Sequence, residues 1–320
     1  MKIVILGAGA LGSLIGAHLA RAGEDVTLIA RGNRATFIRE HGVTVTGLVN
    51  LTVPVNVTAR PNDVREADAL IVTVKTYDME TALDAVAHLR VGSVLSVQNG
   101  VVKDEQLARC FGWEKTLGAA ALVSAEVTPA GPVRFTVNEW FCIGELPEGT
   151  SERVQALVTM LARAGIRAEA SPRIRSVEWT KYVVGVHWMA LAALSRLETY
   201  KIFKHPDLAY VAAMVTREMA QLAARLGIPL LDLGAFRAKT LSSVPLEEAV
   251  ANVRQVGEMM EANGATAHKV SILQDLERGR RLEVEAILGY AVHKGAELGA
   301  PLPTVETCYR LIKGIDESVR

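Results

Sequence analysis

The stretch Lys2–Gly12, KIVILGAGALG, decides the fold. Its first five residues form an apolar, β-branched run that predicts a buried strand, and the apolar spacing over residues 10–22 predicts a helix. Between them lies the pattern G-x-G-x-x-G, in which the first glycine permits a tight turn, the second lets a diphosphate approach the backbone, and the third lets helix and strand pack closely. The diphosphate then binds free N–H groups at the helix N-terminus. The predicted dinucleotide-binding loop consists of Gly7, Ala8, Gly9, Ala10, Leu11 and Gly12.

The alternation of strands and helices continues outward from this stretch. Strands are predicted at residues 25–30, 69–74 and 93–97, and helices near 79–89 and 152–164. Residues 42–58 predict an extra strand pair, and residues 116–122 and 134–143 also have β-character. Continuous apolar strands joined by helices are typical of a parallel sheet that is covered on both faces. The first half is therefore predicted to be a Rossmann-type α/β domain.

The second half of the sequence has a different pattern of hydrophobicity. Strand-like runs almost vanish, and apolar residues recur at helical spacing. Helices are predicted at residues 174–197, 207–226, 246–261, 282–298 and 304–313. The predicted fold class is thus α/β, with a Rossmann-type parallel-sheet domain over residues 1–168 and an all-helical domain over residues 169–320.

Length and charge exclude several classes of protein. The 320 residues suffice for two domains. The 35 Lys and Arg residues balance 35 Asp and Glu residues, so the formal net charge is zero. No global basic field favours nucleic acid or an anionic membrane as a partner. Half of the residues are hydrophobic, which excludes a disordered chain.

The positions of the cysteines, the histidines and the apolar runs indicate whether the chain carries disulfides, a metal site or a membrane segment. Cys110, Cys142 and Cys308 lie far apart, which is no disulfide framework and favours a reducing, cytoplasmic location. The seven histidines show no zinc-binding spacing, so no metal is predicted. The apolar N-terminus carries glycines at the dinucleotide spacing rather than a signal-peptide cleavage site, and the apolar run at 183–194 is too short to span a bilayer. We expect a soluble protein with no membrane partner.

The end of the second predicted strand distinguishes between cofactors. NAD-binding folds usually place an acidic residue there to accept a hydrogen bond from the ribose 2′-OH. This sequence instead has Arg31, with Arg34 close behind it. Because an arginine can pair with a 2′-phosphate, the sequence favours NADP(H). Asn33 could hydrogen-bond a plain ribose, which leaves NADH use open.

Several motifs, taken in order along the chain, resemble the ketopantoate reductase (2-dehydropantoate 2-reductase) family. They are the glycine loop at 7–12, Val74-Lys75, Gln98-Asn99-Gly100, Glu178-Trp179-x-Lys181, and Ser271 with Glu283. The resemblance implies NADPH-dependent reduction of 2-ketopantoate to pantoate, a step of pantothenate and coenzyme A biosynthesis.

The resemblance also implies roles for single residues. Lys181 would be the proton donor, and Asn99 would lie between the nicotinamide and the substrate. Ser271 would contact the substrate, Glu283 would lie near the cofactor ribose and the catalytic lysine, and Lys75 would lie at the cofactor edge of the cleft. These residue types suit the chemistry, because hydride addition to a ketone builds negative charge on oxygen that needs a donor and then a proton.

The sequence departs from the family on the helix that carries Lys181. The family has asparagines that hydrogen-bond substrate four and eight residues after the lysine, where this chain has Gly185 and Met189, and a third near Thr199. Three interpretations are open. The substrate is a bulkier or less polar 2-oxo acid or ketone, or His187 or Thr199 replaces the missing donors, or ketopantoate turnover is slow.

Two other functions compete with a ketopantoate reductase. A β-hydroxyacid dehydrogenase of the 6-phosphogluconate type shares the architecture, but the chain has no Ser-Gly-Gly substrate loop. A non-catalytic NADP(H)-binding sensor would be expected to lose its reaction residues, yet Lys181, Asn99 and Glu283 are present. The Ala-, Leu- and Val-rich helical domain is compatible with a homodimer formed through it.

Overall fold

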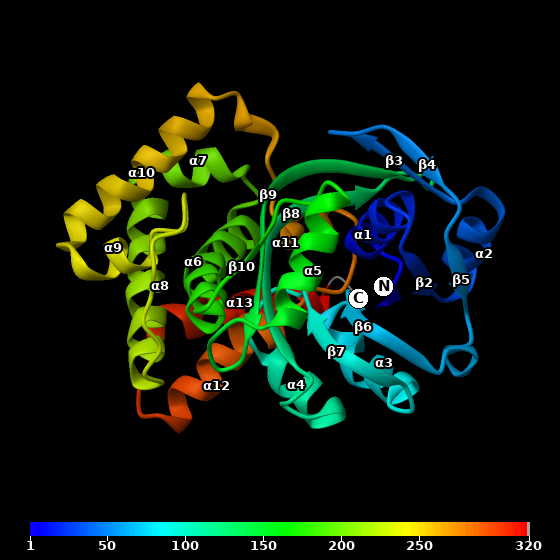
Figure 1. The fold of residues 1–320 in the computed structure, drawn as a ribbon. Helices are drawn as coiled ribbons and strands as arrows, with labels where there is room; N and C mark the ends of the chain where they lie inside the picture. The colour runs from blue at the N-terminus through cyan, green and yellow to red at the C-terminus, as the bar shows by residue number, and fades with distance from the viewer. Residues whose placement is uncertain (319–320) are drawn as a thin grey trace. The chain divides into compact units, whose positions relative to one another are not determined.

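The computed structural model describes residues 1–318 and divides the chain into two compact units, the first at Met1–Arg175 and the second beginning at Ser176. The division falls after the predicted boundary near residue 168, because Ala168–Ala170 forms a strand that pairs with a strand of the first unit. The fold class is confirmed: the first unit is α/β with a parallel sheet, and the second is helical (Figure 1).

Unit 1 contains a five-stranded parallel sheet. Its strands, in spatial order, are β5 (Asn56–Thr58), β2 (Asp25–Ile29), β1 (Lys2–Leu6), β6 (Glu66–Val72) and β7 (Arg90–Ser96). The helices of its connections are α1 (Ala10–Arg21), α2 (Gly32–His41) and α3 (Met79–Val86), and α4 (Val102–Phe111) follows β7. Short 3₁₀ turns lie at Pro61–Asp63 and Thr76–Asp78. Since all five strands run in one direction, their carboxyl ends meet at one edge of the sheet.

A second, mixed sheet completes unit 1. It has the order β10 (Ala168–Ala170), β9 (Val133–Glu145), β3 (Val43–Gly47) and β4 (Leu51–Val53), and β8 (Leu117–Val127) pairs with β9. Helix α5 (Glu152–Arg163) connects β9 to β10. The predicted extra strand pair at 42–58 is present as the antiparallel β3–β4 pair, and the same stretch also supplies β5 to the parallel sheet.

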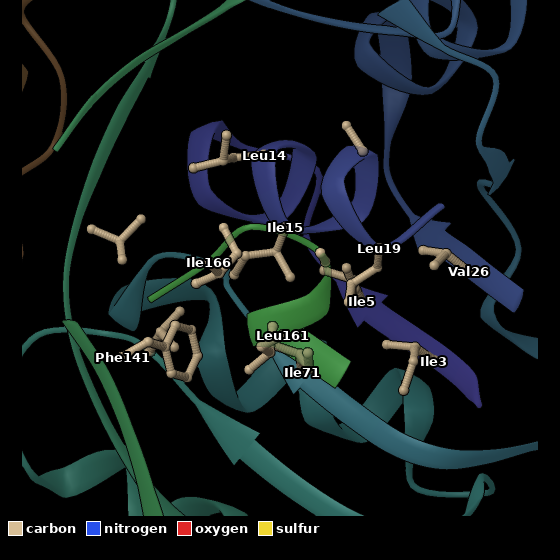
Figure 2. Close-up of a cluster of buried hydrophobic side chains, with 14 of the residues drawn as sticks. Ile3, Ile5, Leu14, Ile15, Leu19, Val26, Ile71, Phe141, Leu161 and Ile166 are labelled. Atoms are coloured by element: carbon tan, nitrogen blue, oxygen red, sulfur yellow. The ribbon is translucent and has the colours of Figure 1, made fainter. Parts of the chain in front are cut away.

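Helix α1 packs between the two sheets and is buried from Gly12 to Leu19 without interruption. In Figure 2, its side chains Leu14, Ile15 and Leu19 cluster with Ile3 and Ile5 of β1, and residues of β9 and α5 join the same core. A helix buried on all sides reads as continuously apolar, which explains why the sequence around this helix resembles a signal peptide.

The N-terminus of α1 lies unusually close to the loop that precedes it. A Cβ atom added to Gly12 would lie 1.9 Å from the Gly7 carbonyl oxygen and 2.4 Å from Oγ1 of Thr73. Gly7 itself has a φ of +104°, a conformation that side chains rarely adopt. Only glycine at both positions allows helix and strand to approach this closely.

Unit 2 is built from helices, which run from green to red in Figure 1. They are α6 (Ile174–Ser195), α7 (Thr199–Lys204), α8 (Pro206–Arg225), α9 (Ala238–Ser243), α10 (Leu246–Ala262), α11 (Ser271–Glu277), α12 (Tyr290–Glu297) and α13 (Pro303–Ser318), with a 3₁₀ turn at Ala265–Ala267 and a π-helical turn at Glu285–Gly289. Buried side chains of α6, α7, α8 and α10 form one of its hydrophobic clusters. Within residues 1–318, no helix combines the length and apolar character needed to cross a membrane.

Exchanging Gly12 for alanine tests the close approach. We expect Gly12→Ala to lower the free energy of unfolding by about 3 kcal/mol or more, because its methyl group overlaps backbone atoms that cannot withdraw. Gly9→Ala is the matched control, since no atom lies within 4 Å of its added Cβ. Urea unfolding of both variants is the measurement, and equal midpoints for Gly12→Ala and the parent would contradict the expectation.

Candidate functional site

The predicted cofactor residues of unit 1 gather at the carboxyl edge of its parallel sheet. The glycine loop follows β1, Arg31 follows β2, Lys75 follows β6 and Asn99 follows β7. Backbone hydrogen bonds connect these strand ends: the Gly7 N–H donates to the Ile29 carbonyl at 3.0 Å, and the Thr73 N–H donates to the Leu6 carbonyl at 2.9 Å. Sheet topology therefore brings together residues that are up to 92 positions apart in sequence, from Gly7 to Asn99.

The N-terminus of α1 is suited to an anionic ligand. Gly9 is the N-cap residue and supplies no side-chain cap, and the first turn contains no acidic residue. The first N–H bonded within the helix belongs to Ser13, which donates to the Gly9 carbonyl at 3.0 Å. Open space lies where a Cβ of Gly9 would be. Free N–H groups, the positive end of the helix dipole and room above the backbone together fit a dinucleotide diphosphate.

The two arginines after β2 have different environments. Arg31 is exposed and precedes α2 as its N-cap residue. Arg34 is partly buried, and its three guanidinium nitrogens donate to the Ala8 carbonyl at 3.0 Å, the Gly131 carbonyl at 2.7 Å and the Ser13 hydroxyl at 2.9 Å. The Ser13 hydroxyl in turn donates to the Ala8 carbonyl at 2.9 Å. Arg34 thus bonds to the glycine loop and to the residues around it, and its assistance to Arg31 at a 2′-phosphate stays a prediction.

Lys75 and Asn99 lie in neighbouring turns that are tied together. Both are partly buried. The Gln98 side-chain amide donates to the Val74 carbonyl at 2.7 Å, which links the turn after β7 to the turn after β6. Gly100 has a φ of +86°, so the Asn99-Gly100 pair forms a tight turn before α4. Among residues 1–318, no group of three or more His, Cys, Asp or Glu side chains could hold a metal ion.

In unit 2, the predicted residues of α6 lie along one side of the helix. Lys181, Gly185 and Met189 follow each other at intervals of four residues, and Trp188, which was not predicted, lies beside them. Lys181 and Trp188 are partly buried, whereas Met189 is buried. A Cβ on Gly185 would meet one atom within 4 Å, the Met189 Cε at 3.4 Å. The missing asparagines therefore leave space at position 185 and apolar surface at position 189.

His187 and Thr199, the two residues that could replace the missing asparagines, are both buried in unit 2. His187 is buried. The Thr216 hydroxyl donates its proton to the Ala212 carbonyl at 2.8 Å, so the hydroxyl oxygen accepts a hydrogen bond from His187 Nδ1 at 2.9 Å. Thr199 is buried too, and its hydroxyl lies 3.1 Å from Nδ1 of His268. Nδ1 of His187 and the hydroxyl of Thr199 are thus engaged inside the helical unit, and the interpretation in which these residues bind substrate stays a prediction.

Ser271 and Glu283 lie on either side of a short connection in unit 2. Ser271 is the first residue of α11, and Glu283 comes directly before the helix that contains the π-turn. Glu283 is buried, and its carbonyl accepts from the Ile287 N–H at 3.2 Å. The preceding residue is also held, because the Leu282 N–H donates to the buried Asp316 carboxylate at 2.8 Å.

Two supporting residues were missed from the sequence. Thr73 donates its hydroxyl to the Gly7 carbonyl at 2.7 Å, and Tyr182, next to Lys181, donates to the Ile287 carbonyl. Neither residue belongs to a motif, since each acts through backbone atoms of a distant segment. The G-x-G-x-x-G pattern indicates that the loop is crowded, but it carries no information on which side chain lies behind it.

Comparison with known proteins extends over both units. The family described as "Ketopantoate reductase PanE/ApbA" matches residues 3–148, and "Ketopantoate reductase PanE/ApbA C terminal" matches residues 173–316. The chain belongs to the ketopantoate reductase family. The family resemblance predicted from the motifs is therefore confirmed.

Individual relatives cover nearly the full length. The chain is 35% identical to a 2-dehydropantoate 2-reductase of Archaeoglobus fulgidus over 99% of each chain. A crystal structure of a PanE/ApbA family ketopantoate reductase from Ralstonia eutropha is 27% identical, with a TM-score of 0.84 over 100% of this chain and 99% of the other. D-mandelate dehydrogenase, determined with NADH and anilino(oxo)acetate, has the same fold, with a TM-score of 0.85 and 21% identity over 100% of this chain and 99% of the other. The family relationship makes this chain an oxidoreductase of the class that acts on CH–OH groups.

Buried histidines make stability depend on pH. Burial lowers the pKa of His187 to about 3, so the folded protein holds it neutral while the unfolded chain binds a proton below about pH 6.5. Stability is fully present above pH 6.5 and falls as the pH drops toward 3, with a slope of about 1.4 kcal/mol per pH unit from this residue.

We expect His187→Gln to reduce the pH slope of the unfolding free energy by about one proton between pH 6 and 4. His205→Gln is the control, because it makes the same substitution at a histidine whose side chain is 54% exposed. His18 and His268, whose pKa values burial also lowers, remain in both variants, so the comparison isolates His187. An unchanged slope in His187→Gln would show that this residue binds its proton equally in both states.

Proposed function

We propose that the chain is an NADP(H)-dependent reductase that converts a 2-oxo acid into a 2-hydroxy acid, nominally 2-ketopantoate into pantoate for pantothenate biosynthesis. The observation that carries the proposal is the combination of an uncapped glycine loop at the edge of a parallel sheet with a helical unit that carries the family's lysine, serine and glutamate. Membership of the family supports the same conclusion.

Residues 1–168 are proposed to bind the cofactor. The loop N–H groups at the start of α1 would hold the diphosphate, with Arg34 and Thr73 fixing the loop behind them. The exposed Arg31 would pair with the 2′-phosphate. Lys75 and Asn99, on the adjoining strand ends, would contact the nicotinamide half. When bound, the nicotinamide supplies the hydride.

Residues 169–320 are proposed to hold the substrate and supply the proton. Lys181 would donate its ammonium proton to the carbonyl oxygen as negative charge develops there. Ser271 would hydrogen-bond the substrate, and the Glu283 carboxylate would favour the charged form of Lys181. A cation at position 181 both attracts an anionic oxo acid and stabilises the developing alkoxide, so one side chain serves binding and catalysis.

A second candidate substrate is a bulkier or less polar 2-oxo acid. Gly185 and Met189 favour it, because the amides that would hydrogen-bond a dihydroxy acid are replaced by space and by a buried thioether. A site built on hydrogen bonds discriminates strongly, so losing them removes the preference for the polar substrate. The fold itself admits such a ligand, since D-mandelate dehydrogenase has been determined with anilino(oxo)acetate. A cytoplasmic location and a homodimer through the helical unit are part of the proposal.

Replacing Arg31 tests the cofactor. We expect Arg31→Ala to weaken NADPH binding by roughly 10- to 100-fold, the loss of one charge-assisted contact, and to leave NADH binding unchanged. Arg39→Ala is the control, because it removes an exposed arginine from the same helix. Dissociation constants come from the fluorescence of the bound reduced cofactor. An equal loss for NADPH and NADH would place Arg31 away from the 2′-phosphate.

Replacing Lys181 tests the reaction. We expect Lys181→Ala to lower kcat for 2-oxo acid reduction by roughly 10²- to 10⁴-fold, the usual contribution of a general acid, with NADPH affinity unchanged. Lys201→Ala, an exposed lysine of α7, should retain full activity. Oxidation of NADPH is followed with ketopantoate, larger aliphatic 2-oxo acids and aryl 2-oxo acids. Tight NADPH binding without lysine-dependent oxidation of any of them would identify a sensor instead.

Placing asparagines at positions 185 and 189 distinguishes between the two candidate substrates. The double variant Gly185→Asn, Met189→Asn should raise kcat/KM for ketopantoate relative to larger 2-oxo acids by about tenfold or more. The Cβ added at position 185 meets only the Met189 Cε within 4 Å, and the second substitution removes that atom. If the parent already prefers ketopantoate and the double variant gains nothing, Gly185 and Met189 are tolerated variations and the second candidate fails.

A further inference from the structure

The hydroxyl of Tyr182 is inserted into the backbone of a neighbouring helix. Tyr182 is buried on α6, directly after Lys181, and its O–H donates to the Ile287 carbonyl at 2.5 Å. Its ring lies edge-on to Trp179, with centroids 5.6 Å apart, and to Tyr290, with centroids 6.3 Å apart. The phenol is thus held both by its ring and by its oxygen.

The helix that accepts this bond departs from α-helical geometry at the same place. Residues Glu285–Gly289 form a π-turn, in which the Tyr290 N–H donates to the Glu285 carbonyl five residues earlier. A regular α-helix would instead join the Ile287 carbonyl to the Ala291 N–H, four residues later. Here the phenol instead donates to the Ile287 carbonyl, so a side chain takes up the acceptor that the regular ladder would use. A side chain inserted into the hydrogen-bond ladder is a recognised cause of such a departure.

The phenol keeps its proton over the working pH range. Burial raises the pKa of Tyr182 well above its usual value, with the neighbouring Tyr290 acting in the same direction, while the Ala291 backbone opposes the shift. The hydroxyl therefore keeps its proton at neutral pH and remains a donor to Ile287 there. Because this proton is bonded to a backbone carbonyl, we assign Tyr182 an effect through position.

The π-turn begins two residues after Glu283. On its N-terminal side, the segment is fixed by the bond from the Leu282 N–H to Asp316 and by the bond from the Ile287 N–H to the Glu283 carbonyl. On the other side, Tyr182 holds the Ile287 carbonyl to α6. π-turns are rare and recur at functional sites. Here the turn lies between the residue next to Lys181 and the residue proposed to set the charge state of Lys181.

We propose that Tyr182 is a positioning residue of the active site. Its hydroxyl keeps the turn at Glu285–Gly289 in the π conformation and thereby holds Glu283 at a fixed place relative to Lys181. The proposal rests on the proposed function, in which Lys181 is the proton donor. Without the hydroxyl, the Ile287 carbonyl and the Ala291 N–H can bond to each other, and the turn tightens by one residue and carries Glu283 with it.

Tyr182→Phe removes the oxygen and keeps the ring contacts with Trp179 and Tyr290. We expect kcat to fall about tenfold or more with the Kd for NADPH unchanged. The high-pH limb of the kcat profile, which reports deprotonation of Lys181, should move to lower pH, because a displaced carboxylate no longer favours the charged lysine. Tyr309→Phe is the matched control: its hydroxyl contacts the Glu285 carboxylate at 2.9 Å but no backbone atom of the turn. It should lower the melting temperature without moving the limb.

A second variant perturbs the same turn without touching Tyr182. Deleting Ala286 shortens the turn at Glu285–Gly289 by one residue, to the length of an α-helical turn, and leaves the Tyr182 hydroxyl in place. We expect this deletion to move the limb in the same direction, and it decides the question if Tyr182→Phe fails to fold.

The proposal is overturned if Tyr182→Phe, or the deletion of Ala286 in its place, lowers only the melting temperature and leaves kcat and the limb at their parental values. Lys181→Ala run beside them keeps the two proposals distinguishable. Full activity in Lys181→Ala contradicts the proposed function itself, whereas loss of activity there with a parental Tyr182→Phe contradicts the role of Tyr182 alone.

Discussion

The contact between Gly12 and the Gly7 carbonyl is the constraint on which the rest of unit 1 depends. With no Cβ at position 12, α1 begins directly above the end of β1, and its unbonded N–H groups point out over the edge of the sheet. The same approach places α1 deep enough to be covered by the second sheet. One steric requirement therefore sets both the core of the unit and the position of its anion-binding helix end.

Around this contact, one group of charged and polar side chains bonds to the glycine loop, and another side chain, Arg31, is exposed to solvent. Arg34, Ser13 and Thr73 lie behind the loop and bond its carbonyl oxygens, so that its N–H groups are left to face a ligand. Arg31 lies on the outside, where a phosphate can reach it. On α6 of unit 2, Tyr182 bonds to a backbone carbonyl and His187 bonds to the Thr216 hydroxyl, and Lys181 and Gly185 lie along one side of the helix. In both units, buried polar groups stabilise the elements that carry the residues we propose for binding and reaction.

Much of this organisation follows from sequence pattern. The sequence predicts the strand–loop–helix at the N-terminus, the alternation of strands and helices after it, and the change to helices in the second half. These predictions are possible because buried strands and amphipathic helices have distinct periods of hydrophobicity. Helices α2 and α4 were not predicted: α2 buries only Ala35 and Ile38, and the buried side of α4 includes the ion-paired Lys103 and Asp104, so neither shows a clear apolar stripe. The π-turn was missed as well, because it depends on a hydroxyl 105 positions away in sequence. Motifs locate the groups that touch ligands, but the residues that hold those groups act through space and leave no pattern.

The central claim is that the glycine loop and the lysine helix serve one hydride transfer to a 2-oxo acid. The most direct measurement is to reduce 2-oxo acids with NADPH carrying deuterium at C4, in each stereochemical position separately, and to locate the label by mass spectrometry. We predict one deuterium on C2 of the hydroxy acid from one of the two cofactors and none from the other. A hydroxy acid without deuterium from either cofactor, or no product from any 2-oxo acid, would contradict the account.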